Sequence, residues 1–319
     1  MADRRSEGAR VVFMGTPDFA VPVLTALIRE YRVVGVVTQP DRPAGRGRQV
    51  TISPVKQMAL EHDLLLLQPR SLRSPDALAQ LAAWKPDVIV VAAFGQILRQ
   101  DVLDLPPCGC LNVHASLLPR WRGAAPVSAA ILGGDEVTGV TIMKMDAGLD
   151  TGPILAQREE PIRPDDTAAT LEGRLAQLGA DLLVETLPAY LAGALQPRPQ
   201  PEEGVTYAKR LRKRDGRVDW SRPAVELDRQ VRAFTPWPGA FTTLRGRRLK
   251  LLRTAPLPNW RGDAPPGTVV ALDDGVAVAT GEGALCLEKV QLAGRRRMDI
   301  VAFLCGQRDC IGSCLGIEE

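Results

Sequence analysis

The stretch RVVFMGTPDFAVPVLTALI, residues 10–28, decides the fold of the first part of the chain. Its apolar residues 11–14 are followed by Gly15 and by the turn-forming triplet Thr16-Pro17-Asp18. Beyond the turn, from Phe19 to Ile28, apolar residues recur at the spacing of one helix face. The stretch therefore predicts a strand, a turn and a helix.

The same alternation continues along the chain. Further strands are expected at residues 32–38, 64–67 and 87–94, with helices at 53–62 and 74–84. Strands that alternate with helices pair in parallel, because the crossover connections are right-handed. We therefore expect a doubly wound α/β domain with a mostly parallel, Rossmann-like sheet. The triplet Gly15-Thr16-Pro17 differs from the G-x-G-x-x-G pattern, so a dinucleotide cofactor has no motif support.

The second part of the chain has a different character. Extended segments at 138–145 and 153–160 precede a long amphipathic helix, expected from about residue 165 to 195. A proline-rich segment, 196–203, then predicts a stiff extended linker. Short β-like segments follow at 242–244, 248–252, 267–272, 275–280 and 284–292. We expect two domains, residues 1–203 and 204–319, the second a small OB-like β-barrel.

Composition excludes several classes of protein. Of the 319 residues, 45% are hydrophobic and 24% charged, which is typical of a globular protein rather than a fibrous or disordered one. Apolar runs of about 18 residues are absent from the sequence, so we expect a soluble, cytoplasmic protein. Six cysteines are too few for a disulfide scaffold, and with two histidines and no paired C-x-x-C motif we expect no metal site.

The net charge of +3 conceals an asymmetry along the chain. Up to residue 205 there are 20 Lys and Arg against 24 Asp and Glu, and beyond it there are 20 against 13. A positive second part indicates a polyanionic partner. Basic residues gather in the loop 39–49, with Arg42, Arg46 and Arg48, and in the segment 209–217, where six of nine residues are basic.

The residues best suited to catalysis lie in the window GCLNVHASLLPRWRG, residues 109–123. Asn112 and His114 are two residues apart in an expected strand, and such residues point to the same face of a sheet. If that strand ends at the carboxyl edge of the parallel sheet, the amide and the imidazole lie where open α/β folds bind ligands. A core histidine at a strand end gives the same pattern, so the pair alone leaves both interpretations open.

The rest of the window resembles the signature of the folate-dependent formyltransferases, in which a strand-borne Asn and His precede a Ser-Leu-Leu-Pro loop. Asp150, in Gly148-Leu149-Asp150-Thr151-Gly152, matches the third catalytic residue of that family. Further motifs at residues 14–19, 38–47, 120–126 and 234–239 are similar to its methionyl-tRNA formyltransferase branch. The resemblance covers about residues 10 to 305. Ala115 departs from it, because the resemblance leads us to expect Gly there.

The resemblance implies a reaction and a site. Members of this branch transfer the formyl group of 10-formyltetrahydrofolate to the α-amino group of methionine on initiator methionyl-tRNA, in support of translation initiation. Asn112 and His114 would donate hydrogen bonds to the oxygen that becomes negative. Asp150 would orient and charge His114, or accept the proton of the amine directly or through a water. The folate site would be lined by Ser116, Leu117, Leu118 and Pro119, with residues 94–98 as its opposite wall.

The resemblance also implies how the tRNA is held. The loop near residues 39–49 would enter the acceptor stem, with Arg42 at its most important basic position and Arg46 beside it. Further phosphate contacts would come from Lys209, Arg210, Arg212 and Lys213. We expect a monomer whose partners are these two substrates, with neither metal nor membrane contact.

Two other functions compete with this one. A formyltransferase of the same superfamily that acts on an amino-sugar nucleotide or a purine precursor would share Asn112, His114 and Asp150, but it would not need the basic segments. A noncatalytic RNA-binding protein on an enzyme scaffold would not need those three residues, which are intact here. The three residues and the basic segments together favour formylation of methionyl-tRNA.

Overall fold

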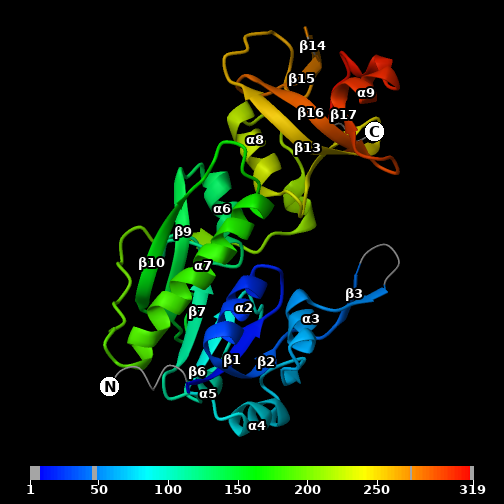
Figure 1. Cartoon of the computed structure of the whole chain (residues 1–319). Helices are drawn as coiled ribbons and strands as arrows, with labels where there is room; N and C mark the ends of the chain where they lie inside the picture. Colours follow the sequence, from blue (N-terminus) through cyan, green and yellow to red (C-terminus); the bar gives the residue numbers. More distant parts are fainter. Residues whose placement is uncertain (1–7, 45–48, 274, 317–319) are drawn as a thin grey trace. The chain divides into compact units, whose positions relative to one another are not determined.

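The structure is a computed structural model and describes residues 8–44, 49–273 and 275–316. The chain forms two compact units. Unit 1 comprises the residues up to Pro126 together with Val137–Pro161 and Glu172–Ala208. Unit 2 comprises Val127–Glu136, Ile162–Leu171 and the chain from Lys209 onward. Figure 1 shows the elements of both.

Unit 1 alternates strands with helices, as the first part of the sequence predicts. Its strands are β1 (Arg10–Gly15), β2 (Arg32–Val37), β3 (Arg42–Ala44), β4 (Gln49–Thr51), β5 (Leu66–Leu67), β6 (Val88–Ala92), β7 (Cys110–His114), β8 (Arg122–Gly123), β9 (Val137–Lys144), β10 (Ile154–Pro161) and β11 (Tyr207–Ala208). Its helices are α2 (Ala20–Glu30), α3 (Pro54–Glu61), α4 (Pro75–Ala83), α5 (Gln100–Leu103) and most of α7 (Ala168–Leu191). Ser53 caps α3 by accepting a hydrogen bond from the backbone nitrogen of Lys56 at 3.1 Å.

The central sheet of unit 1 has the strand order β10-β9-β7-β6-β1-β2-β5. The five strands from β7 to β5 are parallel, and β9 and β10 are antiparallel to their neighbours. The mostly parallel, doubly wound sheet is therefore confirmed. Two short pairs lie outside it, β3 with β4 and β8 with β11.

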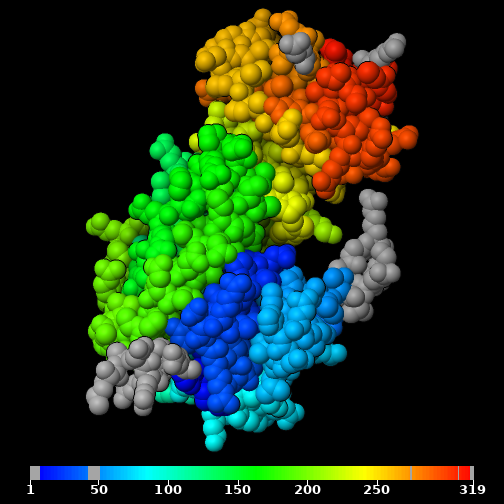
Figure 2. Space-filling view, viewed as in Figure 1, coloured from blue at the N-terminus to red at the C-terminus, as the bar shows by residue number. Residues whose placement is uncertain are grey.

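Helices cover both faces of this sheet. On one face, Met14 of β1 and Ile89 of β6 pack in one buried cluster with Leu81 of α4. The other face carries α7, where Gly179 fits because a Cβ at that position would stand 2.6 Å from the side chain of Val113 in β7. Figure 2 shows α2 beside α7 on this side of the unit. The carboxyl ends of the parallel strands remain as the edge at which a site can form.

Unit 2 is built around an antiparallel sheet. Its strands are β12 (Ala240–Leu244), β13 (Arg247–Leu257), β14 (Val269–Leu272), β15 (Gly275–Ala279), β16 (Ala284–Leu292) and β17 (Met298–Asp299), in the order β12-β13-β16-β15-β14 with β17 on β16. Its helical elements are α6 (Pro126–Gly133), α8 (Ala224–Ala233), α9 (Ile300–Cys305), η1 (Lys213–Gly216) and η2 (Arg308–Cys310). Leu227 and Val231 of α8 lie in the same core as Leu251 of β13. A small β domain after the α/β domain is thus confirmed.

The proline-rich segment, predicted as a stiff linker, is hydrogen-bonded into unit 1. Arg198 and Ile154 exchange two backbone hydrogen bonds of 2.7 and 2.8 Å. Further along, Tyr207 and Ala208 of β11 pair in parallel with β8. Unit 1 consequently continues to Ala208, beyond the residue 203 at which the sequence suggested a division.

Candidate active site

Strand β7 brings Asn112 and His114 to the same face of the central sheet. It lies between β6 and the antiparallel β9, with His114 opposite Thr141. Val113, between the two, faces α7, so Asn112 and His114 face the other way. His114 is the last residue of the strand and therefore stands at its carboxyl end. This is the arrangement that the Asn-x-His spacing predicts.

Both ring nitrogens of His114 face protein groups. Nε2 lies 3.1 Å from the backbone oxygen of Trp121, and Nδ1 lies 3.8 Å from Oδ2 of Asp150. A carbonyl oxygen only accepts hydrogen bonds, so we assign a proton to Nε2. Nδ1 is then the nitrogen that can gain or release a proton. The side chain is only 6% exposed, so the surrounding protein fixes its orientation.

A tight turn holds the carboxylate of Asp150. The backbone N–H of Gly123 donates a hydrogen bond to Oδ2 at 2.8 Å. Asp150 has a φ of +51°, in the left-handed region. Gly123 suits its own position because its φ is +117° and a Cβ would stand 2.6 Å from the carbonyl oxygen of Ala208. At 14% exposure, the Asp150 side chain keeps some contact with solvent beside His114.

The Asn112 side chain is open to a ligand. It is partly exposed, and it makes no hydrogen bond to another residue of the described chain. A side-chain amide offers two N–H donors. Asn112 is therefore available, next to the pair of His114 and Asp150, for an oxygen that acquires negative charge.

The loop Ser116–Pro119 follows β7 and is held by its own polar groups. The Ser116 hydroxyl donates to the backbone oxygen of Arg120, and Thr141 Oγ1 donates to the backbone oxygen of Ser116, each at 2.6 Å. Gln157 Nε2 donates to the backbone oxygen of Leu118 at 2.8 Å. Ser116 and Leu118 are buried, whereas Leu117 and Pro119 are partly exposed. The first two thus shape the loop, and the latter two remain accessible to a ligand.

Residues 94–98, the expected opposite wall, follow β6, the neighbour of β7. Phe94 and Leu98 are buried in the core beneath. Gln96 is bonded to backbone atoms, accepting from Leu72 and donating to Pro69, each at 3.2 Å. Ile97 is 84% exposed, so it is the side chain of this wall that can contact an apolar ligand.

The residues assigned to tRNA fall into two groups. Those after β11 are exposed: Lys209, Arg210, Arg212 and Lys213. Arg42 lies in β3, but its side chain is not among the parts described, and Arg46 lies outside the described residues. The start of their loop is anchored through Asp41, which accepts hydrogen bonds from Lys56 at 2.5 Å and Gln68 at 2.8 Å. These two bonds, that of Lys56 first, hold the pKa of Asp41 below its ordinary value.

Other groups near the sheet do not add to this chemistry. Burial raises the pKa of the Cys110 thiol to about 12, so the thiol stays neutral and unreactive near pH 7. Among the described residues, no group of three or more His, Cys, Asp and Glu side chains could hold a metal ion. None of the helices in the described ranges is long and apolar enough to cross a membrane.

Sequence patterns did not point to several residues that shape the site. Gln157 holds the loop after β7, Gln200 bonds the turn of Asp150, and Thr206 accepts a hydrogen bond from the backbone of Trp121 at 2.8 Å. Each of them acts on main-chain atoms far away in the sequence. Such contacts cannot be predicted from the spacing of residues in the sequence. Arg122, which donates a hydrogen bond to Gln200, does lie within the motif at residues 120–126.

Family models match both parts of the chain. One described as formyl transferase matches residues 9–187, and one described as the C-terminal domain of formyl transferase matches residues 210–308. The chain belongs to the formyl transferase family. This formyl transferase is 53% identical over 305 residues to the methionyl-tRNA formyltransferase of Myxococcus xanthus, covering 95% of this chain and 97% of that protein. It is also 53% identical over 309 residues to the methionyl-tRNA formyltransferase of Thiobacillus denitrificans, covering 96% and 99%.

Solved structures share the fold. The N-formyltransferase from Helicobacter canadensis, in complex with folinic acid and dTDP-3-aminofucose, matches with a TM-score of 0.65 at 16% identity, over 91% of this chain and 100% of that one. HypX from Aquifex aeolicus, in complex with tetrahydrofolic acid, matches with a TM-score of 0.61 at 20% identity over 92% of this chain. The formyl transferase spans 46% of that HypX chain, about half its length. At these identities the likeness establishes the fold alone.

Proposed function

We propose that this formyl transferase moves the formyl group of 10-formyltetrahydrofolate to the α-amino group of methionine on initiator methionyl-tRNA, in support of translation initiation. One observation carries the proposal: His114 and Asp150 stand 3.8 Å apart beside the open amide of Asn112. They do so in a chain about half identical, over nearly its whole length, to proteins named methionyl-tRNA formyltransferase.

The transfer needs hydrogen-bond donors for one oxygen. A bond forms between the methionine nitrogen and the formyl carbon, and the bond from that carbon to the folate nitrogen breaks. Asn112 donates an N–H to the formyl oxygen as negative charge develops there. His114, when protonated at Nδ1, places a positive charge beside the same oxygen. Its Nε2–H stays on the backbone oxygen of Trp121, which keeps the ring in place.

The transfer also needs a route for one proton. The attacking amine must lose a proton, and the folate nitrogen that leaves must gain one. Asp150 accepts the proton that the amine loses, directly or through a water, because its carboxylate is partly exposed and already oriented by Gly123. His114 gives its Nδ1 proton to the leaving nitrogen and then takes up the proton that Asp150 received, since Nδ1 faces that carboxylate, so both groups end as they began.

We assign the folate to the surface bordered by the loop Ser116–Pro119. Partly exposed Leu117 and Pro119, and exposed Ile97 after the neighbouring strand, offer apolar contacts for the flat rings of a folate. The buried residues Ser116 and Leu118 keep the loop in shape. The open Asn112 amide fits the formyl oxygen, so the residues present suit this cosubstrate.

We assign the tRNA to the basic residues. The exposed side chains after β11 suit phosphate contact: Lys209, Arg210, Arg212 and Lys213. Arg42 and Arg46 are assigned the same partner on the loop 39–49. In this account the first domain, predicted from the sequence as residues 1–203, binds folate, catalyses and adds the loop 39–49 as a tRNA contact, and the second, predicted as 204–319, supplies the other tRNA contacts. The enzyme acts in the cytoplasm as a monomer, and light scattering after gel filtration tests that state.

A comparison of acceptors tests the proposal. Single-turnover transfer from 10-formyltetrahydrofolate is followed with methionyl initiator tRNA, an amino-sugar nucleotide and a purine-precursor amine. We expect rapid transfer to the tRNA alone. Transfer only to a small amine would assign the same site to another branch of the family. An absence of transfer to any of the three would contradict formyl transfer itself.

A further inference from the structure

We propose that Gln200 is a positioning residue for catalysis, which holds the turn of Asp150 and so fixes where its carboxylate stands relative to His114. The inference rests on the proposed function, because it takes Asp150 as the group that handles the proton. Gln200 lies in the proline-rich segment after α7, fifty positions along the chain from Asp150. Its side chain is partly buried.

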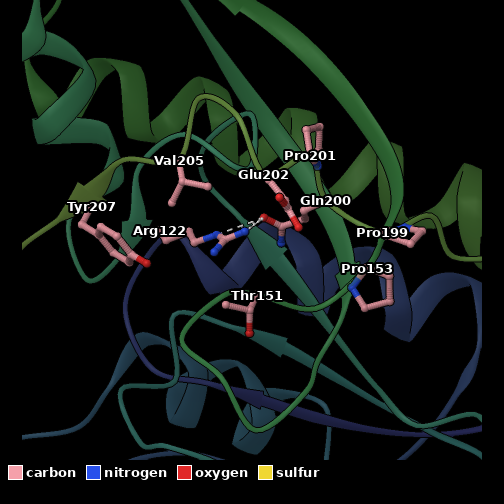
Figure 3. A pocket seen from close by; sticks show the side chains of 9 residues that line it. All are labelled: Arg122, Thr151, Pro153, Pro199, Gln200, Pro201, Glu202, Val205 and Tyr207. Atoms are coloured by element: carbon pink, nitrogen blue, oxygen red, sulfur yellow. Dashed lines mark hydrogen bonds between the residues drawn. The ribbon is translucent and has the colours of Figure 1, made fainter.

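The side chain of Gln200 uses both ends of its amide. Nε2 donates to the backbone oxygens of Asp150 at 2.8 Å and Gly152 at 2.7 Å. Oε1 accepts from Nε and Nη2 of Arg122 at 3.1 and 2.7 Å. Figure 3 shows the guanidinium aimed at this side chain, with their hydrogen bonds as dashed lines. Four hydrogen bonds therefore tie one amide to the turn of Asp150 and to Arg122 of β8.

The turn of Asp150 needs such support. The residue has a φ of +51°, a conformation that L residues with a side chain seldom adopt and that persists where neighbouring groups determine it. Gly123 restrains the carboxylate, and Gln200 restrains the backbone oxygens of Asp150 and Gly152. Together they constrain the side chain from one end and the main chain from the other.

The same segment also supports the partner of Asp150. Thr206 accepts a hydrogen bond from the backbone nitrogen of Trp121 at 2.8 Å, and its backbone oxygen accepts one from Arg122 at 2.9 Å. The oxygen of Trp121 is the group that receives the Nε2–H of His114. The segment 198–208 thus holds the turns on which both members of the pair depend.

The inference depends on the neutral amide group of Gln200 as well as on its position. The guanidinium of Arg122 meets the neutral oxygen of Gln200. A cation placed directly on the carboxylate would stabilise its charged form and weaken it as a proton acceptor. Gln200 accepts from the cation with a neutral oxygen and holds the turn of Asp150 with its Nε2–H groups. Glutamate has the same size and still accepts from Arg122, but it replaces the donor with an oxygen that faces two carbonyl oxygens.

The test uses the full-length enzyme and steady-state formylation of methionyl-tRNA. Gln200→Glu is expected to lower kcat by about 10–100-fold and to leave KM for both substrates within about threefold, since small misplacements of catalytic groups cost rate of this order. Gln200→Ala is the second variant. Gln200 lines an open surface pocket of about 520 Å³, so water can fill the space left by truncation and the fold is retained (Figure 3). Gln196→Ala is the matched control, because Gln196 is exposed and its side-chain amide donates to the backbone oxygen of Gly193.

A double-mutant cycle separates positioning from general support of the fold. In an Asp150→Asn background, each Gln200 variant is expected to lower kcat by less than about threefold further, because its route to the chemistry is already removed. An equal loss in both backgrounds would overturn the inference, as would wild-type kcat in both Gln200 variants. In those cases a severe defect in Asp150→Asn alone would leave the proposed function standing. Wild-type activity in Asp150→Asn would overturn the role given to Asp150, and with it this inference, while formylation of methionyl-tRNA itself would stand.

Discussion

Replacing Asp150 by Asn removes one charge from the site and little else. Asn keeps the size of the side chain and an oxygen that can accept the hydrogen bond from Gly123. The charge removed lies 3.8 Å from Nδ1 of His114. At an effective dielectric constant of about 20, two unit charges at that distance interact by about 4 kcal/mol. Because 1.36 kcal/mol corresponds to a factor of ten in rate, losing this interaction can slow the reaction by at most about a thousandfold.

Solvent reduces that ceiling, since the Asp150 side chain is 14% exposed. We therefore expect Asp150→Asn to slow single-turnover formylation at neutral pH by about 100–1,000-fold. Affinity for 10-formyltetrahydrofolate, measured by titration calorimetry, should stay within about threefold, because the proposed folate contacts are elsewhere. Asp146→Asn is the matched control on the same loop: Asp146 is exposed, and Asn can still accept from Gly148 and Thr151. A loss below tenfold in Asp150→Asn, with the fold intact by circular dichroism, would refute the reasoning.

Three further predictions concern stability, thiol reactivity and tRNA binding. Burial, and to a lesser extent the charge of Asp18, raises the pKa of Glu172, so this carboxyl stabilises the folded state at pH values below its ordinary pKa of 4.5 and loses that contribution as the pH rises. Glu172→Gln should therefore have a higher Tm than the wild-type protein at pH 8 and no advantage in acid. Equal Tm values at pH 8 would contradict this. Iodoacetamide at pH 8 should modify exposed Cys305 and Cys314 and spare Cys110 in the folded protein, as read by peptide mass spectrometry; native labelling of Cys110 would show that its burial is wrong. Alanine at Lys209, Arg210, Arg212 and Lys213 should reduce the slope of log affinity for tRNA against log salt by about 3, if each side chain meets one phosphate, and an unchanged slope would make them ordinary solvated surface.

The sequence predicts those parts of the fold that depend on local periodicity. The apolar runs of β1 and β6 are long enough, and their flanking turns clear enough, to indicate a buried parallel sheet. The same periodicity places Asn112 and His114 on one face, because alternation within a strand requires no knowledge of the rest of the molecule. Helix α8 was not anticipated, since it lies among short β segments where turn signals dominate the pattern.

The contacts that complete the site could not be read in this way. Asp150 was found by resemblance, because its approach to His114 depends on a turn with a positive φ and on the backbone of Gly123. Ser116 was assigned to the folate wall, yet its hydroxyl is buried and bonds within its own loop. Gln200 stands in a segment whose prolines suggest a spacer, while its hydrogen bonds join it to main-chain oxygens distant in sequence. Hydrogen bonds to main-chain atoms distant in sequence cannot be predicted from composition or from the spacing of residues.

His114→Ala tests the central claim most directly. The variant is compared with the wild-type protein in single-turnover formylation of methionyl initiator tRNA, and its affinity for the same tRNA is measured at one salt concentration. We expect formylation to be abolished while tRNA affinity stays within about threefold, because the ring is buried at the end of β7 and the basic residues assigned to tRNA are elsewhere. Retained formylation with lost tRNA binding would contradict the account.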